Sequence, residues 1–159
     1  MTKVLPPDWS WCVVSDLDGT LANNQHRLHH VLKKRAADRD WDAFHREILG
    51  DAVHTPVAAA FNALGALSGM QRVIVTARSI IDHELTAMWL DKHFIDYDHI
   101  FMRGAKDFRD DRLVKLDILR NMRNHFKLEP WIVLDDRDRV VSMWRQQGIT
   151  CFQVADGSF

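Results

Sequence analysis

The chain contains 159 residues, of which 47% are hydrophobic and 27% are charged. This balance is typical of a soluble globular protein, and the length is that of one domain, so we expect residues 1–159 to form a single domain. The 21 basic and 22 acidic residues give a formal net charge of −1. Proteins that coat long nucleic acids usually need a strong basic excess, so the charge disfavours that class, although an enzyme that grips one nucleic-acid end remains compatible with it.

The sequence indicates neither secretion nor a membrane segment. Residues 1–9 contain no apolar run of the kind a signal peptide needs, and no stretch approaches the ~20 apolar residues that span a bilayer. Cys12 and Cys151 both lie in apolar runs, so we expect reduced core residues rather than the alternative, a disulfide between neighbouring strands. We therefore expect no membrane partner and a cytoplasmic protein, in the host cytoplasm if a phage encodes it.

Short apolar runs alternate with helical patterns along most of the chain. The runs that predict buried strands are 11–17, 72–76, 99–102, 131–134 and 150–154. The helical patterns span about 56–69, 81–93, 111–126 and 137–147. Strands that alternate with helices favour an α/β fold, in which a Rossmann-like parallel sheet forms the middle of three α/β/α layers.

Residues 25–50 interrupt this alternation. They contain two helical patterns, 26–35 and 41–49, with no strand between them. Because the segment directly follows the first predicted strand, we expect a small helical cap inserted there, over the carboxyl edge of the sheet.

Acidic side chains follow two separate strands. Asp16 and Asp18 come after the first strand, and Asp135 and Asp136 after the fourth. Ligands of open α/β sheets bind at the carboxyl ends of strands, where these acids would converge. A cation must neutralise such a cluster, and hard carboxylate oxygens select Mg²⁺ over zinc. The alternative, that the acids only cap the following helices, accounts for one or two of them.

The order of these residues resembles a known pattern. Asp16-Leu-Asp-Gly-Thr-Leu, Thr76, Lys115 and Asp135-Asp136 are similar to the four motifs of the haloacid dehalogenase (HAD) superfamily of phosphatases, over almost the whole chain. The run from Asp135 to Phe159 is similar to the end of the phosphatase domain of phage polynucleotide kinase–phosphatases. The resemblance implies a HAD-like fold and a Mg²⁺-dependent phosphatase.

The resemblance also implies roles for individual residues. Asp16 would attack phosphorus and form an aspartyl-phosphate, and Asp18 would act as general acid and base. Thr76 would donate a hydrogen bond to a phosphoryl oxygen, and Lys115 would neutralise charge on the nucleophile and the phosphate.

Metal and substrate contacts follow from the same motifs. Asp16, the backbone carbonyl of Asp18, and the pair Asp135 and Asp136 would hold Mg²⁺, and the sequence leaves open which of the last two binds it directly. Thr20, inside the first motif, would contact the substrate.

Three further residues refine this interpretation. Arg27 and Arg78 match arginines of the phage enzymes, and each guanidinium group can bind a phosphate or a phosphodiester through two parallel hydrogen bonds. Asp111 lies one helical turn before Lys115, so we expect it to orient that lysine.

Residues 25–50 contain two other candidate features. His26 and His30 have helical i, i+4 spacing, but they lack the third ligand that a zinc site needs. Trp41 and Phe44 are expected in the core, with stacking on a nucleic-acid base as the alternative.

The function that these observations favour is removal of a 3′-phosphate from a nucleic-acid or nucleotide end. The alternative enzyme is a 5′-nucleotidase acting on (deoxy)nucleoside monophosphates, and a catalytically silent binding module is a third hypothesis. No glycine lies in a Gly-x-x-x-x-Gly-Lys-Ser/Thr loop, so we expect no kinase activity. The sequence does not indicate an oligomeric state.

Overall fold

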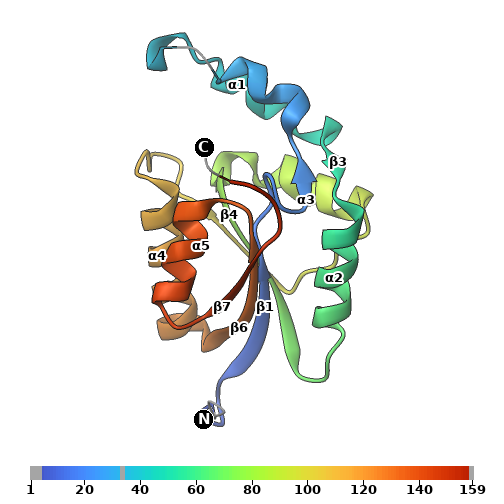
Figure 1. Cartoon of the computed structure of the whole chain (residues 1–159), viewed down its shortest axis with the longest axis vertical. Helices are drawn as coiled ribbons and strands as arrows, with labels where there is room; N and C mark the ends of the chain where they lie inside the picture. The colour runs from blue at the N-terminus through green and yellow to red at the C-terminus, as the bar shows by residue number, and fades with distance from the viewer. Residues whose placement is uncertain (1–4, 33–34, 158–159) are drawn as a thin grey trace.

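The computed structural model describes residues 5–32 and 35–157, and within them a five-stranded sheet forms the middle of the protein (Figure 1). Its strands, in the spatial order β5-β4-β1-β6-β7, are His99–Arg103, Met70–Ser79, Ser10–Ser15, Leu128–Asp135 and Thr150–Gln153. All four pairings between neighbouring strands are parallel. The carboxyl ends of the strands therefore share one edge of the sheet, with β1 at its centre.

Helices cover both faces of this sheet (Figure 1). α2 (Thr55–Gly65) and α3 (His83–Lys92) lie on one face, and α4 (Asp111–Asn121) and α5 (Asp138–Gln146) on the other. A π-helical turn, Met122–Phe126, continues α4. The predicted three-layer α/β/α fold is confirmed. Within the described residues, no helix combines the length and the apolar character that crossing a membrane requires.

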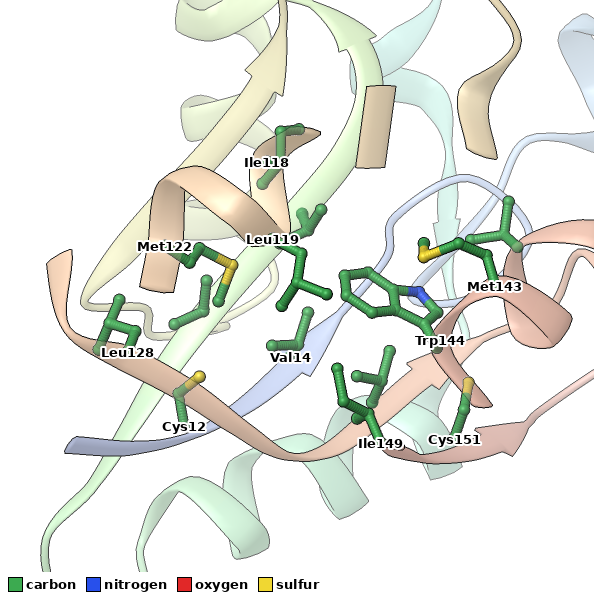
Figure 2. Close-up of a cluster of buried hydrophobic side chains, with 14 of the residues drawn as sticks. Cys12, Val14, Ile118, Leu119, Met122, Leu128, Met143, Trp144, Ile149 and Cys151 are labelled. Atoms are coloured by element: carbon green, nitrogen blue, oxygen red, sulfur yellow. The ribbon is translucent and has the colours of Figure 1, made fainter. Parts of the chain in front are cut away.

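The core between the sheet and the pair α4–α5 is centred on Trp144, which is fully buried (Figure 2). The same cluster contains Val14 of β1 and both cysteines, Cys12 and Cys151. The cysteines are free and buried, as the sequence predicted. The indole of Trp144 also donates a hydrogen bond from Nε1 to Oδ2 of Asp135, at 3.3 Å, so this core directly supports a residue at the carboxyl edge.

Among the element boundaries that differ from the predicted ones, those of β4 and α2 matter most for the site and its turns. β4 runs to Ser79 rather than ending at residue 76, so both Thr76 and Arg78 belong to the strand. α2 ends at Gly65 instead of continuing to residue 69. Gly69 then takes a φ of +76° in the turn that leads into β4, a conformation that favours glycine.

The inserted segment 25–50 lies beyond the carboxyl edge of the sheet and is called the cap below (Figure 1). Its elements are three 3₁₀ turns and one short α-helix, in chain order Gln25–His30, Ala36–Asp38, α1 (Trp41–Arg46) and Ile48–Gly50. The helix predicted over 26–35 is wrong, because helical structure ends at His30; residues 33 and 34 lie outside the described residues. The helix predicted over 41–49 is divided at Glu47.

Two short strands join the cap to the sheet domain. β2 (Ala22–Asn23) and β3 (Ala52–Val53) pair in antiparallel orientation, so the chain leaves and re-enters the domain side by side. The sequence did not predict this ribbon, since two residues are too few to establish an alternating pattern.

The C-terminal segment returns to the carboxyl edge and packs on the backbone that follows β6. The Asp138 amide donates to the carbonyl of Gly157 at 3.2 Å, and the Gln153 side chain donates to the carbonyl of Asp136 at 2.8 Å. A Cβ at Gly157 would lie 2.1 Å from that Asp136 carbonyl oxygen. Only glycine therefore fits at this contact.

Replacing Gly157 by alanine should lower the free energy of unfolding by about 1–3 kcal/mol, because the added methyl group overlaps the backbone of Asp136 and Arg137. Gly104→Ala is the matched control, since the nearest atom to a Cβ at that position lies 3.9 Å away. Chemical denaturation of both variants measures the difference. Equal stability of the two variants would contradict the packing argument.

Candidate active site

The turn after β1 places Asp16 at the centre of the carboxyl edge. The Asp16 amide donates to the carbonyl of Leu134 in β6 at 3.0 Å, which holds it in register with the end of that strand. The amides of Thr20 and Ala22 both donate to the carbonyl of Leu17, at 3.0 and 2.8 Å, and close a tight turn. Gly19 in this turn has a φ of +90°, and a Cβ there would lie 2.2 Å from Oδ2 of Asp136. Glycine is required for both reasons.

Lys115 of α4 links the two strand ends. Its ammonium lies 2.8 Å from Oδ1 of Asp16 and 2.7 Å from Oδ2 of Asp135. All three side chains are buried, with exposed fractions of 8% or less. Burial by itself would lower the pKa of Lys115. The two carboxylates outweigh this effect and hold the pKa above its usual range. Lys115 is therefore a fixed positive charge beside Asp16.

Three carboxylates form a group suited to a metal ion. One oxygen from each of Asp16, Asp135 and Asp136 lies within 4.8 Å of the others, and all three residues are buried. Burial raises the pKa of Asp16 and of Asp136 above the usual range, and the neighbouring Asp135 adds to both rises. A divalent cation would relieve this repulsion, and an all-oxygen donor set fits a hard ion such as Mg²⁺. The carboxylate of Asp18 is not part of this group.

Asp18 instead faces two arginines. Its Oδ1 accepts hydrogen bonds from Nη2 of Arg27 at 2.5 Å and from Nη2 of Arg78 at 2.7 Å, and its Oδ2 accepts one from Nε of Arg78 at 3.0 Å. Burial by itself would raise the pKa of Asp18, but the guanidinium groups of Arg78 and Arg27 outweigh it and lower the pKa to about 2. The side chain of Asp18 is 24% exposed, whereas those of Arg27 and Arg78 are almost fully buried. The Asp18 end of the cluster therefore faces solvent.

Asp51, at the end of the cap, is a residue that sequence reasoning missed. Its fully buried carboxylate accepts hydrogen bonds from Nε of Arg27 at 2.7 Å and from Nη2 of Arg78 at 2.9 Å. Its carbonyl accepts a hydrogen bond from the indole of Trp89 at 2.8 Å. The available signal was one acidic residue at the point where the inserted segment returns to the domain, opposite two arginines expected at the site.

The two threonines of the expected site differ in what their hydroxyl groups contact. Oγ1 of Thr76 accepts a hydrogen bond from the amide of Arg78 at 3.2 Å, which leaves its hydroxyl proton available to another acceptor. Thr20, expected to contact substrate, donates its hydroxyl proton to Oδ1 of Asp136 at 3.2 Å. In this structure, Thr20 therefore supports a carboxylate of the metal group.

Asp111 does not contact Lys115 as the sequence predicted. It lies at the start of α4, and its carboxylate pairs with Arg137 and with Nε of Arg139, the latter at 2.9 Å. The helical spacing is correct, but the hydrogen-bond partners of Lys115 are Asp16 and Asp135. The oriented residue is therefore Arg137, which directly follows Asp136.

The cap histidines do not form a metal group with the described acids. His26 contacts Asp51, which directly follows the cap, and His30 contacts Glu47 inside it, each at 3.0 Å, so each ring already has a carboxylate partner. The expected absence of a zinc site stays a prediction. Of the two cap aromatics, Phe44 is buried and Trp41 is 48% exposed.

Comparison with known proteins first gives the class. A solved haloacid dehalogenase-like hydrolase from Streptococcus pneumoniae matches with a TM-score of 0.63 over 92% of this chain and 84% of its own, at 14% identity, which shows the shared fold. The family described as the polynucleotide kinase PNKP phosphatase domain matches residues 10–159. The chain belongs to this family, and it is a HAD-type phosphatase domain.

Relatives with higher identity are larger proteins. A protein of Autographa californica nuclear polyhedrosis virus, described as a bifunctional polynucleotide kinase/RNA ligase, is 30% identical over 145 residues, which are 89% of this chain and 19% of the relative. A chain in the structure of the Pnkp1/Rnl/Hen1 RNA repair complex matches with a TM-score of 0.76 and 27% identity, over 100% of this chain and 47% of that one. The chain thus spans less than half of the length of each of these two relatives.

Replacing Asp51 by alanine should lower the free energy of unfolding by about 3–5 kcal/mol, because it removes a buried partner from two buried guanidinium groups. The control Asp38→Ala breaks an ion pair with Arg35 in which both side chains are exposed, and should cost about 1 kcal/mol or less. Urea unfolding measures both values. A loss at Asp51 no larger than that at Asp38 would show that the arginines do not depend on it.

Proposed function

We propose that this domain is a Mg²⁺-dependent phosphomonoesterase that acts through an aspartyl-phosphate on Asp16. The observation that supports this most directly is the arrangement around Asp16: a lysine ammonium at 2.8 Å, two further carboxylates of a metal group, and an acid held by two arginines next to it. Nucleophile, counter-charge and acid–base residue thus lie in one connected cluster. Membership of the phosphatase family supports the same reaction class.

In the first half of the reaction, a carboxylate oxygen of Asp16 attacks phosphorus, and the bond from phosphorus to the ester oxygen breaks. Asp18, which takes up a proton once the substrate phosphate has displaced it from Arg27 and Arg78, gives that proton to the leaving oxygen, which departs as a hydroxyl group. In the second half, Asp18 takes a proton from water, which attacks the phosphoryl group and releases inorganic phosphate and Asp16.

The positive charges around the cluster stabilise this transfer. Lys115 lies between Asp16 and Asp135, where its charge favours the ionised form of the nucleophile and fixes its orientation. Mg²⁺ held by Asp16, Asp135 and Asp136, with the backbone carbonyl of Asp18, would supply the charge that orients the phosphoryl oxygens. Thr76 donates its free hydroxyl proton to one of those oxygens.

Arg27 and Arg78 bind the substrate phosphate or an adjacent phosphodiester. Both guanidinium groups now donate to Asp18, so a phosphate dianion competes with that carboxylate for the same donors. Asp51 keeps its own contacts with both arginines, which holds them at the site while Asp18 is released. Asp18 then becomes available for proton transfer to the leaving group.

The substrate class that we propose is a nucleic-acid or nucleotide end bearing a 3′-phosphate. Two relatives are named for a polynucleotide kinase and for an RNA repair complex, which supports polynucleotide ends as the substrate. The alternative, a 5′-nucleotidase, uses the same chemistry and fits the near-neutral net charge. We expect no kinase activity from this chain; transfer of labelled phosphate from ATP to a 5′-hydroxyl end would contradict that expectation.

A panel of phosphorylated substrates assayed with Mg²⁺ separates the two candidate substrates. We expect release of phosphate from a 3′-phosphorylated oligonucleotide at a kcat/KM at least ten times that for nucleoside 5′-monophosphates, a difference of about 1.4 kcal/mol in transition-state binding. DNA and RNA oligonucleotides are compared side by side. Turnover of the monophosphates alone would favour the 5′-nucleotidase.

Exchange of Asp16 for asparagine should lower kcat by about 1,000-fold or more, because the amide has no nucleophilic oxygen anion. The fold should persist, since the replacement is isosteric and removes one of three crowded carboxylates. Asp91→Asn, on the exposed side of α3, is the control. Phosphate release is measured together with circular dichroism; undiminished turnover by folded Asp16→Asn would refute the covalent mechanism.

Mg²⁺ should raise the melting temperature, because it neutralises the buried carboxylate group only in the folded protein. At a concentration 100 times its Kd, the ion would add about 2.7 kcal/mol of stability. Asp136→Asn should lose most of this shift, while Asp91→Asn should keep it. Thermal unfolding with Mg²⁺ and with EDTA measures the shift, and identical melting temperatures for the wild type would argue against a metal site here.

A further inference from the structure

An exposed tryptophan stands on the cap, close to the proposed phosphate site. Trp41 is the first residue of α1, and 48% of its surface is exposed, although its ring makes edge contacts with Phe44 and His45. The helix that carries it is capped at its N-terminus and packed along its inner face. Asp40 accepts a hydrogen bond from the Ala43 amide at 2.8 Å, and buried Phe44 anchors the inner face. The indole is therefore carried by a well-anchored helix, and about half of its surface is exposed to solvent.

A short series of ring contacts connects this indole with the arginine cluster. The guanidinium carbon of Arg27 lies 4.1 Å from the centroid of the Phe44 ring. The Phe44 centroid lies 5.8 Å from that of Trp41, in an edge-to-face arrangement. The other end of the Arg27 guanidinium donates to Asp18. Trp41 is thus two contacts away from a group that we propose to bind phosphate.

Trp41 also lies on the side of α1 that is turned toward the sheet domain. Trp41 and His45 are one helical turn apart, with ring centroids 6.1 Å apart. Nδ1 of His45 lies 3.0 Å from Oδ2 of Asp82, in the 3₁₀ turn that follows β4. The same turn carries Ile80 and Ile81, which are 48% and 72% exposed. The face of α1 that carries Trp41 and His45 is therefore connected to the sheet domain through His45.

We infer that Trp41 is the stacking surface for the base of the nucleotide that carries the scissile phosphate. A flat, rigid and exposed indole accepts any base face, whereas the buried ring of Phe44 is occupied by Arg27. A phosphate held by Arg27 and Arg78 would bring its sugar and base close to the cap, where Trp41 lies two ring contacts from Arg27. The inference rests on the proposed function, and it adds what the cap recognises: a nucleobase attached to the phosphorylated sugar.

The competing interpretation of Trp41 is purely structural. Its contacts with Phe44 and His45 also cover part of the cap, so a smaller side chain could loosen α1. A loosened cap would weaken every substrate equally, because Arg27 belongs to the cap. Loss of a stacking surface would weaken the binding of only those substrates that have a base. The two interpretations therefore differ in substrate discrimination rather than in overall activity.

The test compares a 3′-phosphorylated oligonucleotide with the same oligonucleotide lacking its terminal base. For the wild type, we expect a KM about 5- to 100-fold lower with the base than without it, the range that stacking on one aromatic side chain supplies. In Trp41→Ala, this ratio should fall toward one through a higher KM for the base-bearing substrate, with kcat nearly unchanged. Trp41→Phe should restore most of the ratio. Trp131→Ala, which removes a 43% exposed tryptophan from β6, should behave as the wild type.

The outcomes separate this inference from the proposed function. A wild-type ratio near one, or a Trp41→Ala enzyme that keeps the wild-type ratio, overturns stacking even if the phosphatase is active. If the wild type hydrolyses only nucleoside 5′-monophosphates, the 3′-specificity is wrong, and the same comparison is made between a nucleoside monophosphate and ribose 5-phosphate. If no phosphorylated substrate is hydrolysed, both proposals fail.

Discussion

The ammonium of Lys115 between the carboxylates of Asp16 and Asp135 is the interaction on which the site depends. Three buried carboxylates next to one another would repel strongly, and Lys115 supplies a permanent cation that touches two of them. Its position follows from the fold: β1 and β6 are neighbours, so their ends meet, and α4, which covers one face of the sheet, carries Lys115 to both of them. Trp144 extends this dependence into the core, since its indole holds Asp135 from below. The hydrophobic core and the site are therefore directly connected, through the hydrogen bond from Trp144 to Asp135.

A second charge cluster connects the cap to this centre. Arg27 comes from the cap and Arg78 from β4, and both bind Asp18 of the first turn and Asp51 at the end of the cap. The cap is thus attached by buried ion pairs as well as by the β2–β3 ribbon. A rearrangement of the cap would change the arginines that we propose to grip phosphate. Its structure is consequently part of the site rather than a cover placed over it.

This division assigns different tasks to the sheet domain and the cap. The strand ends carry the residues that we propose as nucleophile, acid–base residue and metal ligands, which any phosphoryl transfer of this type needs. The cap contributes an arginine and an exposed indole, which bear on what is attached to the phosphate. Within one family the first set can stay constant while the second varies, because loops and insertions tolerate change better than strand ends. The two larger relatives share the domain, and each of them extends well beyond it.

The sequence by itself determined the α/β class, the strand-end acids Asp16, Asp18, Asp135 and Asp136, and Lys115 on the helix after the third predicted strand. It could do so because buried strands and helices leave periodic patterns, and because chain order fixes which residues end the strands. The tertiary structure alone decided that Asp51 completes the arginine cluster and that Asp111 pairs with Arg137 rather than Lys115. The same holds for the 3₁₀ turns of the cap. These features depend on side chains that meet from distant positions and on turns too short for a pattern, so no local rule in the sequence encodes them.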